Sequence, residues 1–455
     1  MLSKKYVSVA IFCIIVTFSY SLTSSENVEV DGNRLLPVKI AVVGGGIGGT
    51  SNAFYLRDLF GENAAITLFE KDTIGGRLAT VSIGGAEYEI GGTILHPRNL
   101  YMKKFVQDFG LKERSAEGTD RTMGIYDGEE FVFQSSQYSI ITLLKLLWRY
   151  GLDVFRMRWT ISNLLKKFER IYDFQDAGQS YTDIEGIMAA MGGEEFEGWL
   201  TKPISVVLRD MGMSERFVQE FAAIATRANY GQKPQHDGVC MVSLAAAVPG
   251  LWCIDGGNKL VPEQLLQRSG AKLMKSRVHS VERVAGENAE RPAFRVTWNE
   301  GVKGLKSDVF DIVMMASPIE DDLSGIDFIG FDHSVTTTSQ ATTATRPVTF
   351  NASRQLYKVF STGVLNDTQM EALFESYSEA THRDWLAYPY YQERKAFPGF
   401  VLAEGLFYPN AIEWAASAME MAVIGSRNSA ILAYQYWSGE SPEVKVGASK
   451  VRQEL

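Results

Sequence analysis

The sequence predicts an α/β protein in which a domain built on a parallel sheet is interleaved with a second domain of the α+β class. Three observations support this prediction. A strand, a glycine-rich turn, a helix and a second strand follow one another over residues 37–77. The alternation of strand and helix then gives way to mostly helical patterns over residues 128–230, and strand patterns return between residues 248 and 316.

The first of these features has the order of a dinucleotide-binding unit. A short apolar run rich in β-branched residues, Lys39–Val43, ends in the sequence GGGIGG, and helical spacing follows over Ser51–Leu59. A second strand, Ile66–Phe69, ends at Glu70, about 20 residues past the last glycine. Because strand, turn, helix and acid agree, we interpret the glycines as a nucleotide site rather than a purely structural turn.

Each glycine of the turn has a separate role in this interpretation. Gly44 permits the tight turn, Gly46 lets the backbone approach a pyrophosphate, and Gly49 lets the helix pack closely on the strand. Ile47 and Gly48 of the same turn are further predicted cofactor contacts, and the N–H groups of the helix N-terminus are expected to face the phosphates.

The turn alone does not distinguish between dinucleotides, but a second glycine pair does. Glu70 is placed to accept hydrogen bonds from an adenosine ribose. The sequence Gly75-Gly76-Arg77 follows it and resembles the extension found in the flavin-dependent amine-oxidase and glutathione-reductase-like superfamily. The resemblance implies a Rossmann-like, glutathione-reductase-like FAD-binding domain, with Gly76 and Arg77 among the FAD contacts.

Length and composition indicate a globular protein of two domains. The 455 residues exceed the roughly 150 residues of one typical domain about threefold. The net charge of −9 gives no reason to expect a nucleic-acid partner, because phosphate-binding surfaces normally carry a basic excess. The charge leaves peripheral contact with lipid or a membrane open, and the oligomeric state is open as well.

Residues 1–25 have the pattern of a cleaved signal peptide. Two lysines precede an apolar stretch, Tyr6–Tyr20, and small polar residues follow. The stretch is shorter than the roughly 20 residues of a membrane-spanning helix, and a signal anchor is the alternative. Two glycosylation sequons, at Asn351 and Asn366, agree with entry into the secretory route.

Removal of the signal peptide leaves Cys240 and Cys253 as the cysteines of the mature chain. Two cysteines make no disulfide framework. In an oxidising compartment they either form one bridge or remain two buried thiols.

Patterns along the chain divide it into alternating segments of the two domains. The segments are 37–115, 235–320 and 399–438 for the FAD-binding domain, 116–234 and 321–398 for the substrate domain, and 439–455 for a C-terminal tail. The expected hairpin and strands are Thr80–Leu95, Val248–Cys253, Ala271–Val278, Phe294–Thr297 and Asp308–Ala316. The expected helices are Met102–Leu111, Ser139–Tyr150, Phe155–Ile171, Ile184–Met191, Phe196–Leu200, Glu215–Ala225, Lys259–Ser269 and Ala411–Leu432.

Several longer stretches extend the resemblance to a narrower family. The most particular of them read HPRN at 96–99, TRANYGQ at 226–232 and AASAMEM at 415–421. They resemble the prenylcysteine oxidase family, also called prenylcysteine lyase, and the similarity covers nearly the whole mature chain. Because this family also contains an oxidase-like paralogue, the resemblance determines the fold better than the substrate.

The resemblance implies oxidative cleavage of the thioether in S-farnesyl- or S-geranylgeranyl-cysteine, with cysteine, the prenyl aldehyde and hydrogen peroxide as products. The prenyl C1–H is both allylic and next to sulfur, so hydride loss to FAD leaves a cation that both groups stabilise. Water then adds, the hemithioacetal collapses, and O2 reoxidises the flavin. Such a step needs little acid–base help, so we expect neither a catalytic triad nor a metal site.

The same resemblance implies further FAD contacts at Gly92, Val278, Glu413 and Ala418. The helix expected to begin near Glu413 directs its N-terminal N–H groups at the flavin or its ribityl phosphate. No His or Cys near the glycine turn requires a covalent link, so we expect non-covalent FAD. A lysosomal or other secretory-pathway location follows from the resemblance and the signal peptide together.

For catalysis and substrate binding the resemblance indicates His96 and Arg227. His96 either positions the reaction or shapes the turn before Pro97, with direct proton transfer less favoured. Arg227 either holds the substrate carboxylate in bidentate fashion, with Asn229 or Tyr230 at the amino group, or forms a surface ion pair. No nucleic acid, and no second nucleotide, is required.

A prenyl tail requires a long apolar trough. The residues of suitable character, most of which we expect to pack in the core instead, are Ile140, Ile141, Leu144, Leu147, Trp148, Phe155 and Trp159. Two other functions stay open: a flavin amine oxidase acting on a small amine, and a non-catalytic paralogue that binds FAD and lipid.

Overall fold

The computed structural model describes residues 37–440 with short gaps. Within this span the description leaves out 84, 117–122, 128, 233–249, 287–290, 302–303, 320–324, 333–334, 336–342, 345, 353–354, 362–363, 375, 377–378, 383–385 and 392–395. The predicted signal peptide, Cys240 and nearly all of the predicted C-terminal tail lie outside the described residues. Cys253 is a buried free thiol.

A six-stranded sheet forms the centre of the fold, in the order β20-β21-β13-β1-β2-β9. Its strands are β1 (Val38–Val43), β2 (Ala64–Glu70), β9 (Lys272–Lys275), β13 (Ile312–Met315), β20 (Val401–Ala403) and β21 (Leu406–Phe407). β1 is parallel to both of its neighbours, β2 and β13. Nearly every residue of β1 is buried, as is usual for a parallel strand covered on both faces. The predicted α/β class is confirmed.

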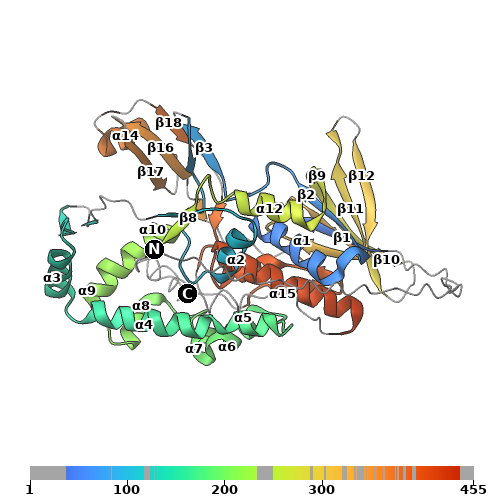
Figure 1. Cartoon of the computed structure of the whole chain (residues 1–455), viewed down its shortest axis with the longest axis horizontal. Helices are drawn as coiled ribbons and strands as arrows, with labels where there is room; N and C mark the ends of the chain where they lie inside the picture. Colours follow the sequence, from blue (N-terminus) through green and yellow to red (C-terminus); the bar gives the residue numbers. More distant parts are fainter. Residues whose placement is uncertain are drawn as a thin grey trace, which may run out of the picture. The chain divides into compact units, whose positions relative to one another are not determined.

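Helices from both ends of the described chain pack beside this sheet. Figure 1 shows α1 (Ile47–Phe60) and α15 (Met419–Ser438) lying side by side, and α12 (Leu260–Ser269) also packs against α1. The contact between α1 and α15 is polar as well as apolar: the Ser426 hydroxyl donates to the Gly48 carbonyl oxygen at 2.7 Å. The C-terminal helix therefore completes the N-terminal nucleotide-binding unit.

A second, four-stranded sheet has the order β12-β11-β10-β14. Its strands are β12 (Leu305–Phe310), β11 (Pro292–Asn299), β10 (Val278–Ala285) and β14 (Asp327–Ile329). The single strands predicted at Ala271–Val278 and Asp308–Ala316 are wrong, because each is two strands that belong to different sheets. Both breaks are marked by a bond to the six-stranded sheet: the Ser276 N–H donates to the Glu70 carbonyl oxygen of β2, and the Asp311 N–H donates to the Lys39 carbonyl oxygen of β1. The chain therefore leaves this sheet after Ser276 and joins it again at Asp311.

The remaining strands form small sheets. These are β3 (Thr80–Ile83) with β4 (Ala86–Glu89), β5 (Glu113–Ser115) with β8 (Trp252–Ile254), β6 (Gly124–Tyr126) with β7 (Phe131–Gln134), β15 (Thr343–Ala344) with β19 (Leu386–Tyr388), and β16 (Arg346–Ala352) between β17 (Gln355–Ser361) and β18 (Glu379–His382). The hairpin predicted at Thr80–Leu95 is confirmed as β3–β4.

The middle of the chain is helical, as predicted, although the boundaries differ. The helices outside the nucleotide-binding unit are α2 (Leu100–Asp108), α3 (Ser139–Tyr150), α4 (Asp153–Phe168), α5 (Arg170–Asp176), α6 (Ile184–Gly192), α7 (Glu194–Gly198), α8 (Ile204–Asp210), α9 (Glu215–Phe217), α10 (Ala223–Tyr230) and α14 (Asp367–Leu373). The predicted helix Phe155–Ile171 is divided between α4 and α5. A π-helical turn, Val218–Ala222, links α9 to α10, and α8 was not predicted.

The apolar residues of α3 and α4 contradict the expectation that most of them pack in the core. The exposed members of the predicted set are Ile140, Ile141, Leu144, Trp148, Phe155 and Trp159. Sequence periodicity shows that a helix has an apolar face, but it does not show whether another element covers that face. Within the described part of the chain, no helix is both long enough and apolar enough to span a bilayer.

Candidate active site

The glycine turn joins β1 to α1, and close contacts explain most of its glycines. Gly44 has a φ of +113°, and a Cβ there would lie 2.6 Å from the carbonyl oxygen of Ala316. A Cβ on Gly49 would lie 1.8 Å from the carbonyl oxygen of Gly44, so only glycine lets α1 pack this closely. A Cβ on Gly48 would lie 3.1 Å from the side-chain oxygen of Asn410. Gly44 and Gly49 have the geometry that their turn and packing roles require.

Gly46 differs from these glycines because the space beside it is open. Its φ of −72° is accessible to any residue, and a Cβ would meet only the carbonyl oxygen of Gly75, at 3.9 Å. Gly46 is the N-cap of α1, and its own position provides no side-chain acceptor for the first-turn N–H groups that begin at Ile47. An open space at an uncapped helix N-terminus fits the pyrophosphate of a dinucleotide, which backbone N–H groups would hold.

The second glycine pair lies directly against the first turn. The Gly75 N–H donates to the Gly45 carbonyl oxygen at 2.9 Å, and Gly75 forms a parallel bridge with Gly46. Gly76 has a φ of +56°, and a Cβ there would lie 3.2 Å from the Cα of Gly46. Gly45 and Gly46 therefore form one continuous backbone surface with Gly75 and Gly76, beside the open space at Gly46.

Glu70 places its carboxylate beside this surface, at the end of β2. The carboxylate accepts the Gly45 N–H at 2.7 Å and the Asp72 N–H at 2.7 Å. Its oxygens have acceptor capacity for a further donor such as a ribose hydroxyl. The Ser276 N–H donates to the Glu70 carbonyl oxygen at 2.8 Å, and Val278 follows two residues later as the buried first residue of β10.

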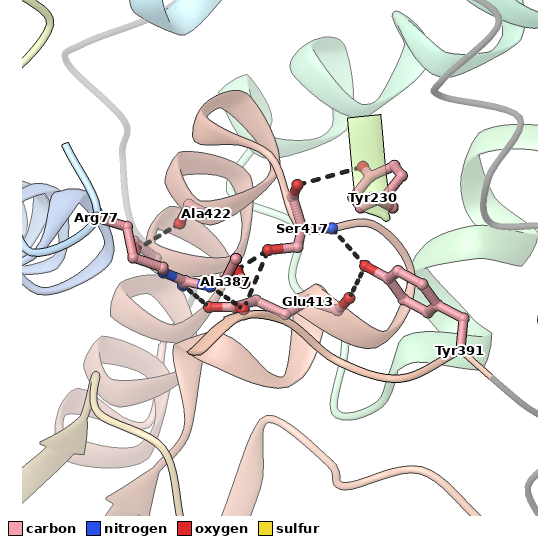
Figure 2. A network of polar contacts seen from close by, with 8 residues as sticks. Arg77, Tyr230, Ala387, Tyr391, Glu413, Ser417 and Ala422 are labelled. Carbon is pink, nitrogen blue, oxygen red and sulfur yellow. Dashed lines mark hydrogen bonds and ion pairs between the residues drawn. The ribbon is translucent and has the colours of Figure 1, made fainter. Parts of the chain in front are cut away.

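Arg77 and Glu413 form the centre of a polar network (Figure 2). Arg77 Nη1 donates to the Glu413 carboxylate at 2.9 Å and to the Ala387 carbonyl oxygen at 2.7 Å, while Nη2 donates to the other Glu413 oxygen. Burial opposes the charged guanidinium, but the Glu413 carboxylate outweighs it and the pKa of Arg77 is raised. The two predicted FAD contacts therefore bind each other.

Two tyrosine hydroxyls bind the backbone around Ser417. The Tyr391 hydroxyl donates to the Glu413 carbonyl oxygen at 2.9 Å and accepts the Ser417 N–H at 2.8 Å, as Figure 2 shows. The Tyr230 hydroxyl donates to the Ser417 carbonyl oxygen at 3.2 Å, and its ring packs edge-on against Tyr388 and Tyr391. Tyr388 and Tyr391 were not among the predicted site residues, although the tyrosine-rich run YPYY is a signal that could have revealed them.

The helix predicted at Ala411–Leu432 begins later than expected. Pro409–Trp414 is a 3-10 turn, the backbone is extended at Ala418 with φ −146° and ψ 157°, and α15 starts at the next residue. The prediction was wrong because the backbone between these elements bonds to the Tyr391 hydroxyl, and such tertiary contacts override local helix propensity. The helix N-terminus expected near Glu413 is therefore at Ala418.

The backbone around Gly92 is held from two sides. Asn258 Nδ2 donates to the carbonyl oxygens of Gly92 and Thr93 at 2.9 and 3.0 Å. Lys358, from β17, donates to the Gly91 carbonyl oxygen at 3.0 Å and to the Thr93 hydroxyl at 2.9 Å. These bonds give the segment one defined path past the second glycine pair.

Lys358 is a polar residue of this region that the sequence analysis missed. Burial lowers its pKa to about 8, and the carboxylate of Glu89 partly opposes this effect. Burial also raises the pKa of Glu89, whose carboxylate accepts the Asn258 N–H. The signal for Lys358 is weak, because a single lysine in the strand sequence QLYKVFS is also typical of a solvent-facing position.

His96 shapes its turn through both its backbone and its ring. Its Nδ1 accepts the Arg98 N–H at 3.0 Å, its N–H donates to the Asn99 side chain, and its carbonyl oxygen accepts the Trp252 indole N–H. Burial, with help from the cations Arg98 and Lys103, lowers the pKa of His96 to about 4. The ring is therefore neutral at neutral pH, with its proton on Nε2, a buried nitrogen without a partner among the described residues.

The three predicted substrate residues of α10 lie in different environments. Arg227 is exposed and forms no ion pair with the described residues. The Asn229 amide donates to the Ala225 carbonyl oxygen one turn earlier, at 2.8 Å, while Tyr230 is buried in the tyrosine cluster. The structure brings Tyr230, and not Arg227 or Asn229, into the network around Glu413.

Comparison of the sequence with known protein families identifies the family of this chain and its Rossmann-like domain. A profile of the prenylcysteine lyase family matches residues 133–355 and 337–445, and a profile of the NAD(P)-binding Rossmann-like domain matches residues 42–109. The chain belongs to the prenylcysteine lyase family. It is 37% identical to prenylcysteine oxidase 1 of Homo sapiens over 90% of this chain and 91% of that protein. It is 31% identical to prenylcysteine oxidase 1-like of Homo sapiens over 92% of this chain and 94% of that protein.

Solved structures of amine oxidases have the same fold as this family member. Cyclohexylamine oxidase from Brevibacterium oxydans aligns with a TM-score of 0.53 at 14% identity, over 88% of this chain and all of that one (100%). A triple mutant of putrescine oxidase aligns with a TM-score of 0.52 at 13% identity, over 87% of this chain and 98% of that one. At these identities the likeness establishes the fold alone.

Proposed function

We propose that this protein is an FAD-dependent thioether oxidase that cleaves S-farnesyl- or S-geranylgeranyl-cysteine. The observation that carries the proposal is the 37% identity to prenylcysteine oxidase 1 over 90% of the chain, together with the open dinucleotide cradle at Gly46. The identity to the 1-like protein is lower, at 31%. This difference favours the enzyme over a non-catalytic paralogue.

The reaction balances as prenylcysteine, O2 and water giving cysteine, the prenyl aldehyde and hydrogen peroxide. FAD, when bound, would supply the hydride acceptor for the prenyl C1 and the route for two electrons to O2. The C–S bond breaks when the hemithioacetal transfers its hydroxyl proton to sulfur and releases the thiol. The protein's own task is therefore to bind and orient FAD and the prenylcysteine.

Residues of the nucleotide-binding unit would hold the cofactor. The first-turn N–H groups of α1 next to Gly46 would bind the pyrophosphate, and the Glu70 carboxylate would accept a ribose hydroxyl. Binding through backbone N–H groups and a carboxylate needs no covalent bond, which supports non-covalent FAD. The test is denaturation followed by filtration: flavin that stays with the chain would contradict this part of the proposal.

The segment around Gly92 would position the reacting centre. Asn258 and Lys358 fix its backbone from two sides, so the segment resists displacement when a ligand binds. His96 is neutral and its Nδ1 is engaged, so we assign it to positioning rather than to proton transfer. Its Nε2–H remains a buried donor available to an acceptor on the flavin or the substrate.

Arg227 would bind the carboxylate of the prenylcysteine. It lies three residues before Tyr230 on α10, so the two side chains leave the helix on adjacent positions of one face. A planar guanidinium suits bidentate recognition of a carboxylate. We expect Arg227→Ala to raise KM for S-farnesylcysteine at least about tenfold, equivalent to about 1.4 kcal/mol, with unchanged flavin content. Arg216→Ala, which removes another exposed arginine, is the control.

The signal-like N-terminus and the sequons support a place in the secretory pathway, which we propose to be the lysosome. Asn366 is exposed at the N-cap of α14, where its side-chain oxygen accepts the Gln369 N–H and its nitrogen is free to carry a glycan. Asn351 lies in β16, the central strand of its sheet. Colocalisation with lysosomal markers, and a glycosidase-induced mass shift lost in Asn366→Gln, would test this proposal.

An anaerobic titration with S-farnesylcysteine tests the function itself. We expect the visible flavin spectrum to bleach with one equivalent of substrate and to return when oxygen is admitted, with release of hydrogen peroxide. A flavin that bleaches with a simple amine instead would assign the amine oxidase function. A flavin that bleaches with neither would assign a non-catalytic paralogue.

A further inference from the structure

We propose that the exposed apolar side chains of α3 and the first part of α4 dock this protein on the surface of an anionic phospholipid bilayer. This apolar ridge consists of Ile140, Leu144, Trp148, Leu152, Phe155 and Trp159. Each of these side chains is at least 50% exposed, and Trp148 is 88% exposed. A cluster of large apolar side chains of this kind on a folded protein marks an interaction surface.

The geometry of the helices shows that the ridge is separate from their core contacts. Ile140, Leu144 and Trp148 follow one another at intervals of four residues in α3, which places them on one face. Tyr150 of α3 is buried and Leu146 packs against the core. The helix is therefore held to the protein by one side and presents a continuous apolar face on another.

The start of α4 continues the same arrangement. Met157 and Ile161 are buried, whereas Phe155 and Trp159 are exposed. Leu152, between the two helices, is 65% exposed. In the part of the chain that the structure describes, these exposures leave the ridge accessible to a partner.

The charge around the ridge selects an anionic partner. Residues 138–168 contain six Lys or Arg and one Asp, whereas the whole chain has a net charge of −9. Two of these six cations pair with acids outside the stretch, Arg149 with Glu220 at 2.6 Å and Lys167 with Glu195. The one acid, Asp153, is buried and pairs with Arg156 at 2.9 Å. Lys145, Arg158 and Lys166 are exposed. A basic, apolar surface on an acidic protein complements anionic lipid headgroups.

The residue types favour a bilayer over a protein partner. Tryptophan, phenylalanine and leucine on one face with lysine and arginine beside them are typical of helices that lie in the membrane interface. With 12 residues, α3 is shorter than the roughly 20 residues needed to cross the hydrocarbon core, so it would lie along the surface. A fluid apolar layer requires no complementary shape, so exposed side chains on helices are sufficient to bind it.

Vesicle sedimentation of the full chain tests this proposal. The vesicles are phosphatidylcholine alone and phosphatidylcholine with phosphatidylserine, and the variants are Leu144→Ser and Trp148→Ser. Leu305→Ser is the matched control, because Leu305 of β12 is 64% exposed and Leu144 is 60% exposed. All variants have the same N-terminal sequence, so any contribution from it to binding is constant.

We expect the parent protein to bind the anionic vesicles more tightly than the neutral ones. Each ridge variant should lower the partition coefficient about tenfold, equivalent to about 1.4 kcal/mol, while Leu305→Ser stays within about twofold of the parent. Equal binding by the parent and both ridge variants would overturn the proposal. Loss of a parent dimer in the ridge variants, seen by light scattering without vesicles, would also overturn it and assign the ridge to a second copy of this chain. Because the readout is binding and not turnover, it is independent of the proposed catalytic function.

Discussion

Two glycines of the turn between β1 and α1 can be replaced separately, and we expect different consequences. A Cβ on Gly49 would lie 1.8 Å from the Gly44 carbonyl oxygen and 2.9 Å from its carbon, both of which are backbone atoms. Overpacking usually costs 1–3 kcal/mol, and here the backbone itself must move. We therefore expect Gly49→Ala to reduce the free energy of unfolding by about 3 kcal/mol or more.

Gly46→Val should instead weaken the binding of FAD. The backbone at Gly46 is unstrained for any residue and the nearest atom to a Cβ is 3.9 Å away, so the flavin-free protein should keep its stability within about 1 kcal/mol. The valine side chain would occupy the space proposed for the pyrophosphate. Loss of two charge-assisted hydrogen bonds at about 1.5–3 kcal/mol each weakens FAD binding by about 10²–10⁴-fold.

Two measurements separate these effects: the ratio of flavin to protein after gel filtration, and thermal unfolding of the flavin-free protein. Gly198→Ala is the control, because Gly198 lies in α7 and a Cβ there would meet no atom within 4 Å. Full flavin content in Gly46→Val would refute the pyrophosphate assignment. Parent-like stability of Gly49→Ala would refute the packing argument.

Three further predictions concern polar side chains that bind other parts of the chain. Burial lowers the pKa of Lys358 to about 8, so the Lys358 side chain is charged below this pH and neutral above it. We expect the rate of turnover to change as the pH passes through about 8. The pH–rate profile of Lys358→Met should lack this change in rate. Burial raises the pKa of Glu420 from 4.5 to about 7, so the folded state binds this proton more tightly than the unfolded state and stability falls, by about 3 kcal/mol, as pH rises through that window. The Glu420 carboxylate, in the first turn of α15, accepts the N–H groups of Tyr101 and Met102 in α2. Glu420→Gln should reduce this pH dependence in thermal unfolding and cost about 1–3 kcal/mol, because one of these two N–H groups loses its acceptor. Arg77→Lys should lower the free energy of unfolding by about 1 kcal/mol, since a lysine cannot bind Glu413 in bidentate fashion and part of the side chain is exposed; an unchanged melting temperature would contradict this expectation.

The sequence predicted the nucleotide-binding unit well because its chemistry is local. The turn at Gly44 and the close packing of Gly49 on Gly44 involve neighbouring residues of the chain, and strand and helix periodicity mark the flanking elements. The same reasoning placed Glu70 at the end of β2. Predictions failed where a continuous β-pattern, such as Ala271–Val278, crosses from one sheet to another, because periodicity does not record which strand is the partner.

The polar network of the candidate site was decided by the tertiary structure. Arg77, Tyr391 and Glu413 come from distant parts of the sequence, and only the returning chain brings them together. Their mutual bonds delay the start of α15 to the residue after Ala418, against the helical pattern of the sequence. No local propensity includes such long-range bonds.

By itself, the sequence determined the α/β class, the dinucleotide turn and the helical character of the middle of the chain, because backbone conformation and periodicity are properties of neighbouring residues. The tertiary structure alone decided that Lys358 is half-buried beside the Gly92 segment and that the apolar face of α3 is exposed. Both results depend on which elements pack against each other, and burial is a property of the surroundings rather than of the residue.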